Sequence, residues 1–380
     1  MNPVPLLFVD HAPAMGGAEN SLKLLLEHLD TERWEVHLAC TDGPLAHAVT
    51  GMDVHLHQVQ LPSLRHSVRA PVNWWRGVNR LAHIARDIHA RVVVANTVRS
   101  AFYAGPAARL AATRFIWMMR DFWLSESKPR HTILDLLGKR VLCYLAHTVI
   151  TNSHATAAHL SCSNKVHVIH NGIDIENFVP QPDSHTSRKL WHIADDWNVV
   201  GTIGRLRPWK GQLRFLHVLK AVLVDVPNTV GMIIGGAPFQ TNDGYVEQLH
   251  QAVTDLDLQD HVIFTGHLTD IRSALAAMDI FVHPGDPEPF GLVNIEAMAM
   301  AKPVIAFAHG ALPEIVADGE TGILIPPVDI RAMAQAICSL LHNPSQQKTM
   351  GSSGRHRAEQ LFSITRTARA FDRLLSPLIE

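Results

Sequence analysis

The chain has 380 residues, and because a domain usually takes about 100 to 200, two domains are expected. Hydrophobic residues make up 47% of it and charged residues 18%, which excludes a disordered chain. The formal net charge of −2 and the isoelectric point of about 6.9 argue against a nucleic-acid partner, because such proteins usually carry a basic face.

The first half alternates short apolar runs with amphipathic stretches. A strand is predicted at 5–10, followed by a helix at 19–29 that places four leucines on one face. Further strands are predicted at 35–40, 53–59, 90–97, 113–120 and 147–153. Strands separated by helices indicate a parallel sheet that is covered on both faces.

A second series of the same kind follows a polar, proline- and serine-rich linker at 178–197. Its strands are predicted at 198–206, 229–238, 261–266, 279–285, 303–308 and 322–326, and terminal helices at 344–378. The fold class is therefore α/β, with two doubly wound domains in tandem and a cleft between them. We place the domains at 1–180 and 181–360, and expect a C-terminal helix at 361–380 that packs back on the first domain.

The cysteines and the N-terminus bear on the compartment. Cys40, Cys143, Cys162 and Cys338 form no C-x-x-C motif, and sparse unpaired cysteines favour a reducing compartment. No signal peptide is recognised, and no apolar run approaches the roughly 20 residues that span a bilayer. The sequence thus predicts a cytoplasmic protein. Its 25 histidines are scattered, and we expect no metal cluster among them.

Two glutamates frame a predicted helix start. Glu288 lies in the loop "DPEPFG", and Glu296 lies about a turn and a half into the helix that begins near Gly291. The first amides of a helix have no partner within it and carry a partial positive charge that suits a phosphate. The pair therefore fits a nucleotide sugar, with the diphosphate at the helix end. On spacing alone, two solvated carboxylates are an equal alternative.

Two glycine-containing turns are further candidates. In "GTIGRLRPWKG", Arg205, Arg207 and Lys210 follow a strand that ends at Gly204, and such cations can hold phosphate oxygens. In "APAMGGAEN", Gly16 and Gly17 separate a strand from a helix and would let the backbone approach a ligand. Neither turn is a P-loop or a dinucleotide-binding fingerprint.

Together these pieces resemble the retaining GT-B glycosyltransferases of family 4 type. The matching motifs are GGAE at 16–19, HNGID at 170–174, GRLRPWKG at 204–211, FTG at 264–266, HPGDPEPFGLVNIEAMAMAKPVIA at 283–306 and GALPEIVADGETGILIPPVD at 310–329. They cover most of the chain, in order. The resemblance implies two Rossmann-like domains that face a central cleft, with the acceptor on the first and the nucleotide-sugar donor on the second.

The resemblance also implies roles for individual residues. Glu288 would lie at the donor sugar and Glu296 at the ribose hydroxyls, while Arg205 and Lys210 would bind the diphosphate and stabilise it as leaving group. The remaining donor-binding positions implied are Gly16, Gly17, Gly204, Gly266, Phe290, Gly291, Leu292 and Val293. The expected reaction is same-face substitution that moves a hexose-type sugar to a glycan, a lipid-linked or a small-molecule acceptor. No metal or other cofactor is expected.

One departure from the family pattern concerns the end of a first-domain strand. Many members carry a His-Asp pair there, whereas this chain has Arg120 and Asp121. Arg120 stays charged and cannot act as a base, so hydrogen bonding to sugar, phosphate or an anionic acceptor is expected of it. Asp121 is a candidate for positioning the acceptor. An ion pair between the two residues is the structural alternative.

The stretch 60–91 contains six arginines and one acidic residue, with Trp74 and Trp75 among them. It could contact an anionic membrane peripherally, or hold a charged or polyprenyl-linked acceptor. A solvated basic helix with inward-packed tryptophans is equally compatible.

Other functions stay open at this point. A sugar-nucleotide epimerase, a retaining phosphorylase and a non-catalytic sugar-nucleotide-binding protein could all share the fold. A metal-dependent GT-A transferase is disfavoured, because the triplet "DLD" at 255–257 reads as a solvated turn.

Overall fold

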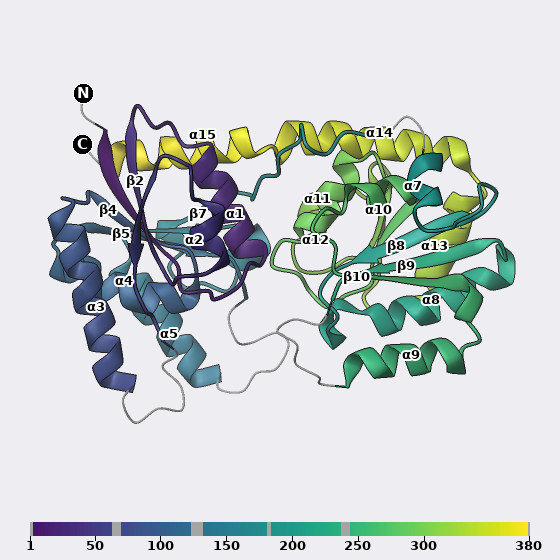
Figure 1. Ribbon diagram of the computed structural model, residues 1–380, viewed down its shortest axis with the longest axis horizontal. Coiled ribbons are helices and arrows are strands. Elements are labelled where there is room, and N and C mark those ends of the chain that lie inside the picture. Colours follow the sequence, from purple (N-terminus) through teal and green to yellow (C-terminus); the bar gives the residue numbers. More distant parts are fainter. Residues whose placement is uncertain (1–2, 63–69, 123–131, 181–183, 237–243, 379–380) are drawn as a thin grey trace. The chain divides into compact units, whose positions relative to one another are not determined.

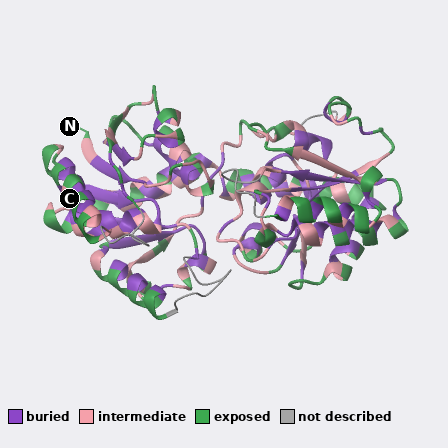
Figure 2. Ribbon diagram, turned by 60° about the horizontal axis from the view of Figure 1, so that its bottom comes forward, coloured by how far each residue is buried: buried purple, intermediate pink, exposed green. Residues whose placement is uncertain are grey.

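A computed structural model describes residues 3–62, 70–122, 132–180, 184–236 and 244–378. The chain divides into two compact units, each built on its own parallel sheet (Figure 1). Unit 1 comprises residues 1–173 and 364–380, and unit 2 comprises residues 174–363. In both units the central strands are buried, the edge strands β3, β7 and β10 are half-buried or exposed, and other exposed residues lie mainly on helices and loops (Figure 2).

Unit 1 is built on a seven-stranded sheet. In chain order the strands are β1 (Val4–Val9), β2 (Trp34–Cys40), β3 (Val54–Gln58), β4 (Val92–Ala95), β5 (Arg114–Met119), β6 (Thr148–Thr151) and β7 (Val166–Val168). They pair in parallel in the spatial order β3-β2-β1-β4-β5-β6-β7. Its helices are α1 (Gly17–Glu27), α2 (Pro44–Ala48), α3 (Ala70–Asp87), α4 (Val98–Leu110), α5 (Thr132–Leu145), α6 (His154–Ala157) and α15 (Ile364–Leu375).

Helices cover both faces of this sheet, because successive strand residues point to opposite faces and both faces are apolar. Leu7 and Val9 of β1 pack with buried residues of α3, α4 and α5, whereas Leu6 and Phe8 pack with α1 and α15. The ring of Phe371 on α15 stacks on Phe8 at 5.9 Å. The helix that ends the chain therefore belongs to the core of unit 1.

Unit 2 holds a six-stranded parallel sheet. Its strands are β8 (Asn198–Ile203), β9 (Thr229–Ile234), β10 (Val262–Gly266), β11 (Ile280–His283), β12 (Val304–Phe307) and β13 (Gly322–Ile325), in the spatial order β10-β9-β8-β11-β12-β13. Its helices are α7 (His185–Lys189), α8 (Gln212–Asp225), α9 (Tyr245–Asp255), α10 (Arg272–Ala277), α11 (Leu292–Ala299), α12 (Leu312–Ile315), α13 (Ile330–Leu341) and α14 (Pro344–Leu361). In this order β8 lies beside β11, and β11 beside β12, so the loops that follow these three strands share one sheet edge.

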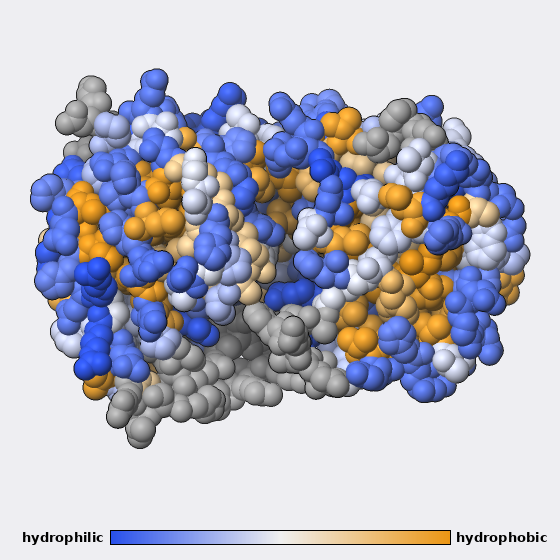
Figure 3. Space-filling model, in the orientation of Figure 1, coloured by the Kyte–Doolittle hydropathy of each residue, from blue (hydrophilic) through white to orange (hydrophobic). Residues whose placement is uncertain are grey.

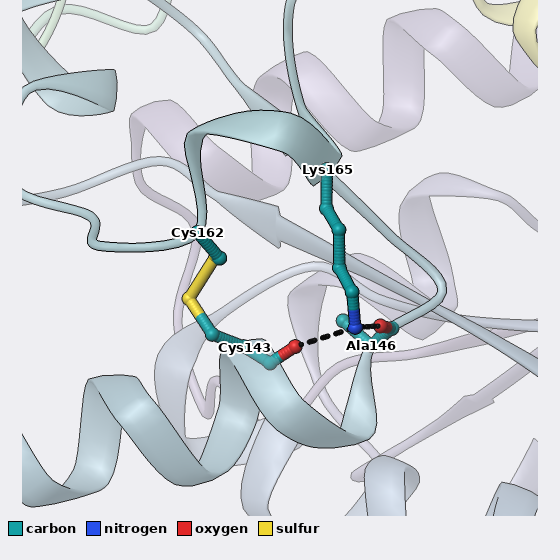
Figure 4. Close-up of a disulfide and its surroundings, with 4 residues drawn as sticks. All are labelled: Cys143, Ala146, Cys162 and Lys165. Atoms are coloured by element: carbon teal, nitrogen blue, oxygen red, sulfur yellow. Dashed lines mark hydrogen bonds between the residues drawn. A yellow bond between two sulfur atoms is a disulfide. The ribbon is translucent and has the colours of Figure 1, made fainter.

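The cysteines correct one prediction. Cys143 on α5 and Cys162 form a disulfide, with 5.9 Å between their Cα atoms (Figure 4). Nearby, the Lys165 ammonium donates to the carbonyls of Cys143 and Ala146, at 3.1 and 2.8 Å. The expectation of four unpaired cysteines was wrong, because the turn after β6 returns the chain to the end of α5. The cysteines therefore no longer argue for a reducing compartment.

The outer surface mixes polar and apolar side chains. On the face drawn in Figure 3, hydrophilic residues dominate and apolar ones lie among them. Within the described part of the chain, no helix is long and apolar enough to cross a membrane.

Candidate active site

Three charged or titratable side chains meet where β8 and β11 end. Lys210 follows β8, His283 is the last residue of β11, and Glu288 lies in the loop after it. The Lys210 ammonium donates a hydrogen bond to Oε1 of Glu288, and Nε2 of His283 lies 3.5 Å from the same oxygen. Parallel strands bring their carboxyl ends to one edge, which is why residues 78 positions apart in sequence converge here.

The electrostatics of this cluster keep Glu288 ionised. Burial alone would raise the pKa of Glu288, but the Lys210 ammonium and the hydrogen bond from His283 outweigh it and hold that pKa well below its usual range. The carboxylate is thus a fixed negative charge throughout the physiological pH range. It can accept hydrogen bonds from a ligand but cannot donate a proton to one.

Glycines of neighbouring loops fix the backbone of Glu288. Ala311 donates its amide to the Glu288 carbonyl at 2.9 Å, and Gly310 beside it has a φ of +57°. A Cβ atom at Gly310 would lie 2.5 Å from the Glu288 oxygen and 2.7 Å from its nitrogen. Gly211 has a φ of +76°, and a Cβ atom there would lie 2.1 Å from the carbonyl oxygen of Pro284. Only glycine permits these approaches, so both loops depend on it.

Helix α11 starts directly beside Glu288. Its N-cap is Gly291, with a φ of +93°, and a Cβ atom there would lie 3.8 Å from Cβ of Glu288. Within the described ranges, the amides of Leu292 and Val293 donate to no protein acceptor. Free first-turn amides and the helix dipole can together attract an anion next to the Glu288 carboxylate.

Glu296 is half-buried on the same helix. Burial raises the pKa of its carboxyl to about 7. Across the residues that the structure covers, its side chain has no hydrogen-bond or ion-pair partner. Two hydroxyl groups of a ligand could supply the partners that the ionised form lacks.

The other predicted donor-site residues of unit 2 fall into two groups. Arg205 is exposed, and Gly204 packs against the stem of Lys210, since a Cβ atom at Gly204 would lie 3.4 Å from Cδ of that lysine. Gly266 ends β10 with a φ of +69° and open space at its Cβ position. The ring of Phe290 is buried and packs edge-on against Phe362 at 6.1 Å, so its place at the donor stays a prediction. Its side chain anchors the loop in the core.

Unit 1 carries a second polar cluster where β1, β4 and β5 end. Asn96 donates to Asp10 at 2.7 Å, and its oxygen accepts from Nε of Arg120 at 2.8 Å. The Arg120 guanidinium also donates to the side chain of Asn171. Burial lowers the pKa of Arg120 to about 10, against the attraction of Glu19 and Asp10. The guanidinium stays charged at neutral pH and is held on both sides.

Glu19, in the first turn of α1, completes this cluster. Its carboxylate lies against the turn before the helix, since a Cβ atom at Gly16 would be 2.9 Å from Oε2 of Glu19. Burial, and then the charge of Asp10, raise the pKa of Glu19 to about 7. Gly17 has open space around its Cβ position. Asp121, the neighbour of Arg120, is exposed.

The chain is similar in sequence to known glycosyltransferases over both units. Residues 183–357 match the family of glycosyl transferases group 1, and residues 15–177 match glycosyltransferase family 4. A lipopolysaccharide core biosynthesis mannosyltransferase of Rhizobium meliloti is 32% identical over 254 residues, which are 66% of this chain and 70% of that protein. A GDP-mannose-dependent monoacylated alpha-(1-6)-phosphatidylinositol monomannoside mannosyltransferase of Corynebacterium glutamicum is 30% identical over 93% of this chain and 92% of its own.

This chain belongs to glycosyltransferase family 4. The family 4 glycosyltransferase has the GT-B fold of two parallel α/β sheets, which confirms the predicted fold class. The solved structure of Anabaena HepE in complex with UDP and glucose matches it with a TM-score of 0.82 and 28% identity, over 98% of this chain and 99% of that one. The predicted enzyme class, a retaining hexosyltransferase that uses a nucleotide sugar, is likewise confirmed.

Sequence reasoning missed several residues of this glycosyltransferase's two clusters. They are His283, Asp10, Glu19, Asn96 and Asn171. Asp10 and Asn96 directly follow the strands β1 and β4, His283 is the last residue of β11, and Glu19 and Asn171 lie inside the quoted motifs GGAE and HNGID. Polar residues at strand ends were the available signal, because such ends form the ligand edge of a parallel sheet.

Proposed function

We propose that unit 2 of this glycosyltransferase binds a nucleoside-diphosphate hexose at the end of α11. The diphosphate would accept hydrogen bonds from the amides of Leu292 and Val293 and ion pairs from Lys210 and Arg205. The observation that supports this most is the juxtaposition of Lys210, an ionised Glu288 and free first-turn amides. Together they offer positive charge for phosphates beside one fixed acceptor for sugar hydroxyls.

Glu296 would hold the ribose hydroxyls. Its carboxyl has no partner within the described residues, and hydrogen bonds from two hydroxyls would favour the ionised form. Gly204 and Gly266 would let the nucleoside approach the backbone, because neither position has a side chain to displace.

The proposed chemistry is same-face substitution. As the bond from the sugar to the diphosphate breaks, the acceptor hydroxyl bonds to the same carbon and passes its proton to the departing phosphate oxygen. Lys210 and Arg205 would stabilise the negative charge that develops on the diphosphate. Glu288 orients Lys210 and stays ionised, so its role is positioning and charge stabilisation and not proton transfer.

The acceptor is proposed to bind unit 1, near the cluster that contains Arg120. That guanidinium is fixed by Asn96 and Asn171, so it presents a constant charge where β5 ends. Gly16 and Gly17 would admit ligand atoms to the start of α1, and the exposed Asp121 would position an acceptor hydroxyl. The proposed acceptor class is a glycan, a lipid-linked sugar or a small molecule.

We further propose peripheral contact with an anionic membrane, on the cytoplasmic side where anionic lipids are concentrated. Apolar residues are exposed on one side of α5: Ile133, Leu134, Leu136, Leu137, Val141 and Tyr144. The buried side of the same helix instead holds the ion pair of Asp135 and Lys139, at 3.1 Å. A helix with its apolar side outward favours an interfacial position.

Helix α3 lies in the basic stretch 60–91 and would contribute to the same membrane-binding surface as α5. Trp75 is 50% exposed on it, and Arg76 and Arg80 lie on the same helix. Trp74 instead is half-buried and donates to the carbonyl of Phe102 at 3.0 Å. Helix α4 contacts both α3 and α5, and in Figure 1 both helices begin at the lower end of unit 1. Arginines could then meet lipid phosphates while apolar side chains enter the interface.

The experiment for the donor site measures nucleotide release from UDP-glucose and from GDP-mannose, with and without candidate acceptors. Acceptor-dependent release, with retained anomeric configuration in the product by NMR, supports the proposal. Conversion of the donor without any acceptor would favour an epimerase instead. Donor binding that persists unchanged in Lys210→Ala and Glu296→Gln variants would contradict the assigned site.

A further inference from the structure

Two neighbouring strands of unit 1 carry four side chains that can bind metal ions. Glu35 and His37 lie on β2, and His55 and His57 lie on β3. Residues two apart on a strand share a face, and the parallel register pairs His37 with His55. All four side chains therefore project from one face of the sheet, next to its edge strand.

The distances within this cluster are short. Oε1 of Glu35 lies 3.2 Å from Nε2 of His37 and 3.8 Å from Nε2 of His55. One ligand atom from each of these three residues lies within 4.8 Å of the other two. The rings of His37 and His55 stack at 4.7 Å with 24° between their planes, so the two imidazoles lie side by side across the strand pair.

We propose that Glu35, His37 and His55 form a binding site for a divalent transition-metal ion, with Zn²⁺ as the reference ion. Two imidazole nitrogens and one carboxylate oxygen suit Zn²⁺, which commonly takes three protein ligands and a water in a tetrahedron. Imidazole ligands disfavour Mg²⁺ and Ca²⁺, which prefer oxygen. This inference does not depend on the proposed donor and acceptor sites.

Of the three proposed ligands, His37 is buried, whereas the side chains of Glu35 and His55 are partly exposed. The side chain of His37 is 7% exposed, whereas those of His55 and Glu35 are 58% and 41% exposed. One ligand is thus held rigidly by the sheet, and the other two leave the ion a path from solvent. Ordinary edge-strand polarity explains exposed histidines. It does not explain a buried imidazole that faces a carboxylate and a second imidazole.

His57 would act as a positioning residue. Its Nε2 lies 3.0 Å from Nδ1 of His37, so it contacts the ring nitrogen that the ion does not use. A hydrogen bond at that nitrogen fixes the tautomer and the orientation of a metal-binding histidine. The ion is assigned to the Glu35 side of His37, because Nε2 of His37 and Nε2 of His55 both approach Oε1 of Glu35 there.

The bound ion would join the edge strand to the rest of the sheet. β3 pairs only with β2 among the described strands, and its residues are half-buried or exposed. A metal ion that bridges Glu35 and His37 to His55 adds a cross-strand link where the backbone ladder ends. The expected consequence is a metal-dependent rise in the thermal stability of the protein.

The test titrates tag-free protein with Co²⁺, read by its visible absorption, and with Zn²⁺, read by calorimetry. We expect one site in the native protein, and at least a tenfold weaker affinity in His55→Ala and in Glu35→Gln, whose side chains are exposed enough to replace without a cavity. His57→Gln should weaken binding by about 10- to 100-fold, as loss of an orienting partner does.

The matched control is His217→Ala, an exposed histidine on α8 of unit 2. Its affinity for Co²⁺ and Zn²⁺ should equal that of the native protein. Equal affinities in the native protein, His55→Ala and Glu35→Gln would overturn the proposal, because binding would then come from scattered surface histidines. A Zn²⁺-dependent rise in melting temperature that persists in His55→Ala would overturn the proposed strand link.

Discussion

Lys210 on one loop of unit 2 donates a hydrogen bond to Glu288 on another, and the two residues are 78 positions apart in the chain. The pair links the loop after β8 to the loop after β11 and fixes the ammonium group that we propose binds the donor diphosphate. Several expectations about activity, stability and binding depend on this pair and on the clusters around it.

Replacing Lys210 with alanine should lower turnover at saturating donor by about 100-fold or more, the range for loss of one preorganised charge-stabilising group. The measurement is the steady-state rate with donor well above its Michaelis constant. Lys220→Ala is the matched control, because Lys220 is an exposed lysine on α8 whose ammonium lies 3.8 Å from the exposed carboxylate of Asp257. Near-normal turnover in Lys210→Ala would exclude the leaving-group role.

Replacing Gly310 with alanine should displace Glu288 and destabilise unit 2. An L-residue at this φ costs about 1–2 kcal/mol, and the overlap of its Cβ with the Glu288 backbone adds about 1–3 kcal/mol. Chemical unfolding and donor affinity would both report the change. Gly319→Ala is the control, because Gly319 also has a positive φ of +76° but nothing within 4 Å of its Cβ position. Equal losses of stability and donor affinity in the two variants would show that the Glu288 loop accommodates the extra methyl group.

The raised pKa of Glu296 predicts how stability changes with pH. In the folded protein this carboxyl has a pKa of about 7, against 4.5 as the reference value. The folded state therefore binds more protons than the unfolded state between these values, so the contribution of Glu296 to stability falls as pH rises from about 4.5 to 7.

A Glu296→Gln variant removes this loss and should be more stable than the native protein above pH 7, by up to about 3 kcal/mol. Melting temperatures measured from pH 4.5 to 8, without donor, test it. The prediction fails if the difference in melting temperature between the variant and the native protein does not grow as pH rises. Donor affinity should fall in the same variant, since an amide replaces the proposed acceptor of ribose hydroxyls.

Arg120→Lys should impair use of the acceptor more than binding of the donor. Lysine keeps the charge but lacks the planar fork that reaches both Asn96 and Asn171. We expect kcat/KM for the acceptor to fall by about tenfold, the cost of roughly one hydrogen bond to a charged group. Donor affinity, measured by thermal shift, should stay within about twofold. A larger loss of donor affinity than of acceptor efficiency would reverse the assignment of this cluster.

The apolar side of α5 and the basic α3 predict weak binding to anionic vesicles at low salt. Flotation with vesicles that contain acidic lipid should recover part of the protein, and higher salt should release it, because exposed charges are then screened. Leu137→Gln and Trp75→Ala should each reduce recovery. Val224→Gln, at an apolar side chain of unit 2 that is 80% exposed, is the control. Absence of recovery at low salt, or equal recovery of all variants, would remove this surface from consideration.

Local pattern was sufficient for most of the fold. Apolar runs such as 5–10 and 279–285 mark the strands β1 and β11, because a strand buried on both faces needs a continuous apolar segment. The start of helix α11 at Gly291 was also predicted from the sequence, since a glycine after a proline-rich loop favours a helix N-cap. Residue type and spacing also identify Glu288, Glu296 and Lys210 as candidates, without any knowledge of the contacts between them.

Contacts between segments distant in sequence could not be predicted from local patterns. Cys143 and Cys162 were expected to be unpaired, and the structure joins them. The contact of the buried Phe290 ring with Phe362, 72 positions further along the chain, was likewise not predicted. The histidines were expected to be scattered, but the register of β2 and β3 gathers His37, His55 and His57 beside Glu35. Each difference concerns a pair whose proximity depends on how elements pack.

The sequence by itself determined the α/β class, the two series of strands and the residue types at the proposed donor site, because hydrophobic periodicity and turn chemistry act over a few neighbouring residues. Only the tertiary structure decided that Lys210 and His283 hold Glu288 ionised, and that Asn96 and Asn171 hold Arg120. Strand order and register set these proximities, and they arise from the burial of whole faces, which no short stretch of sequence encodes.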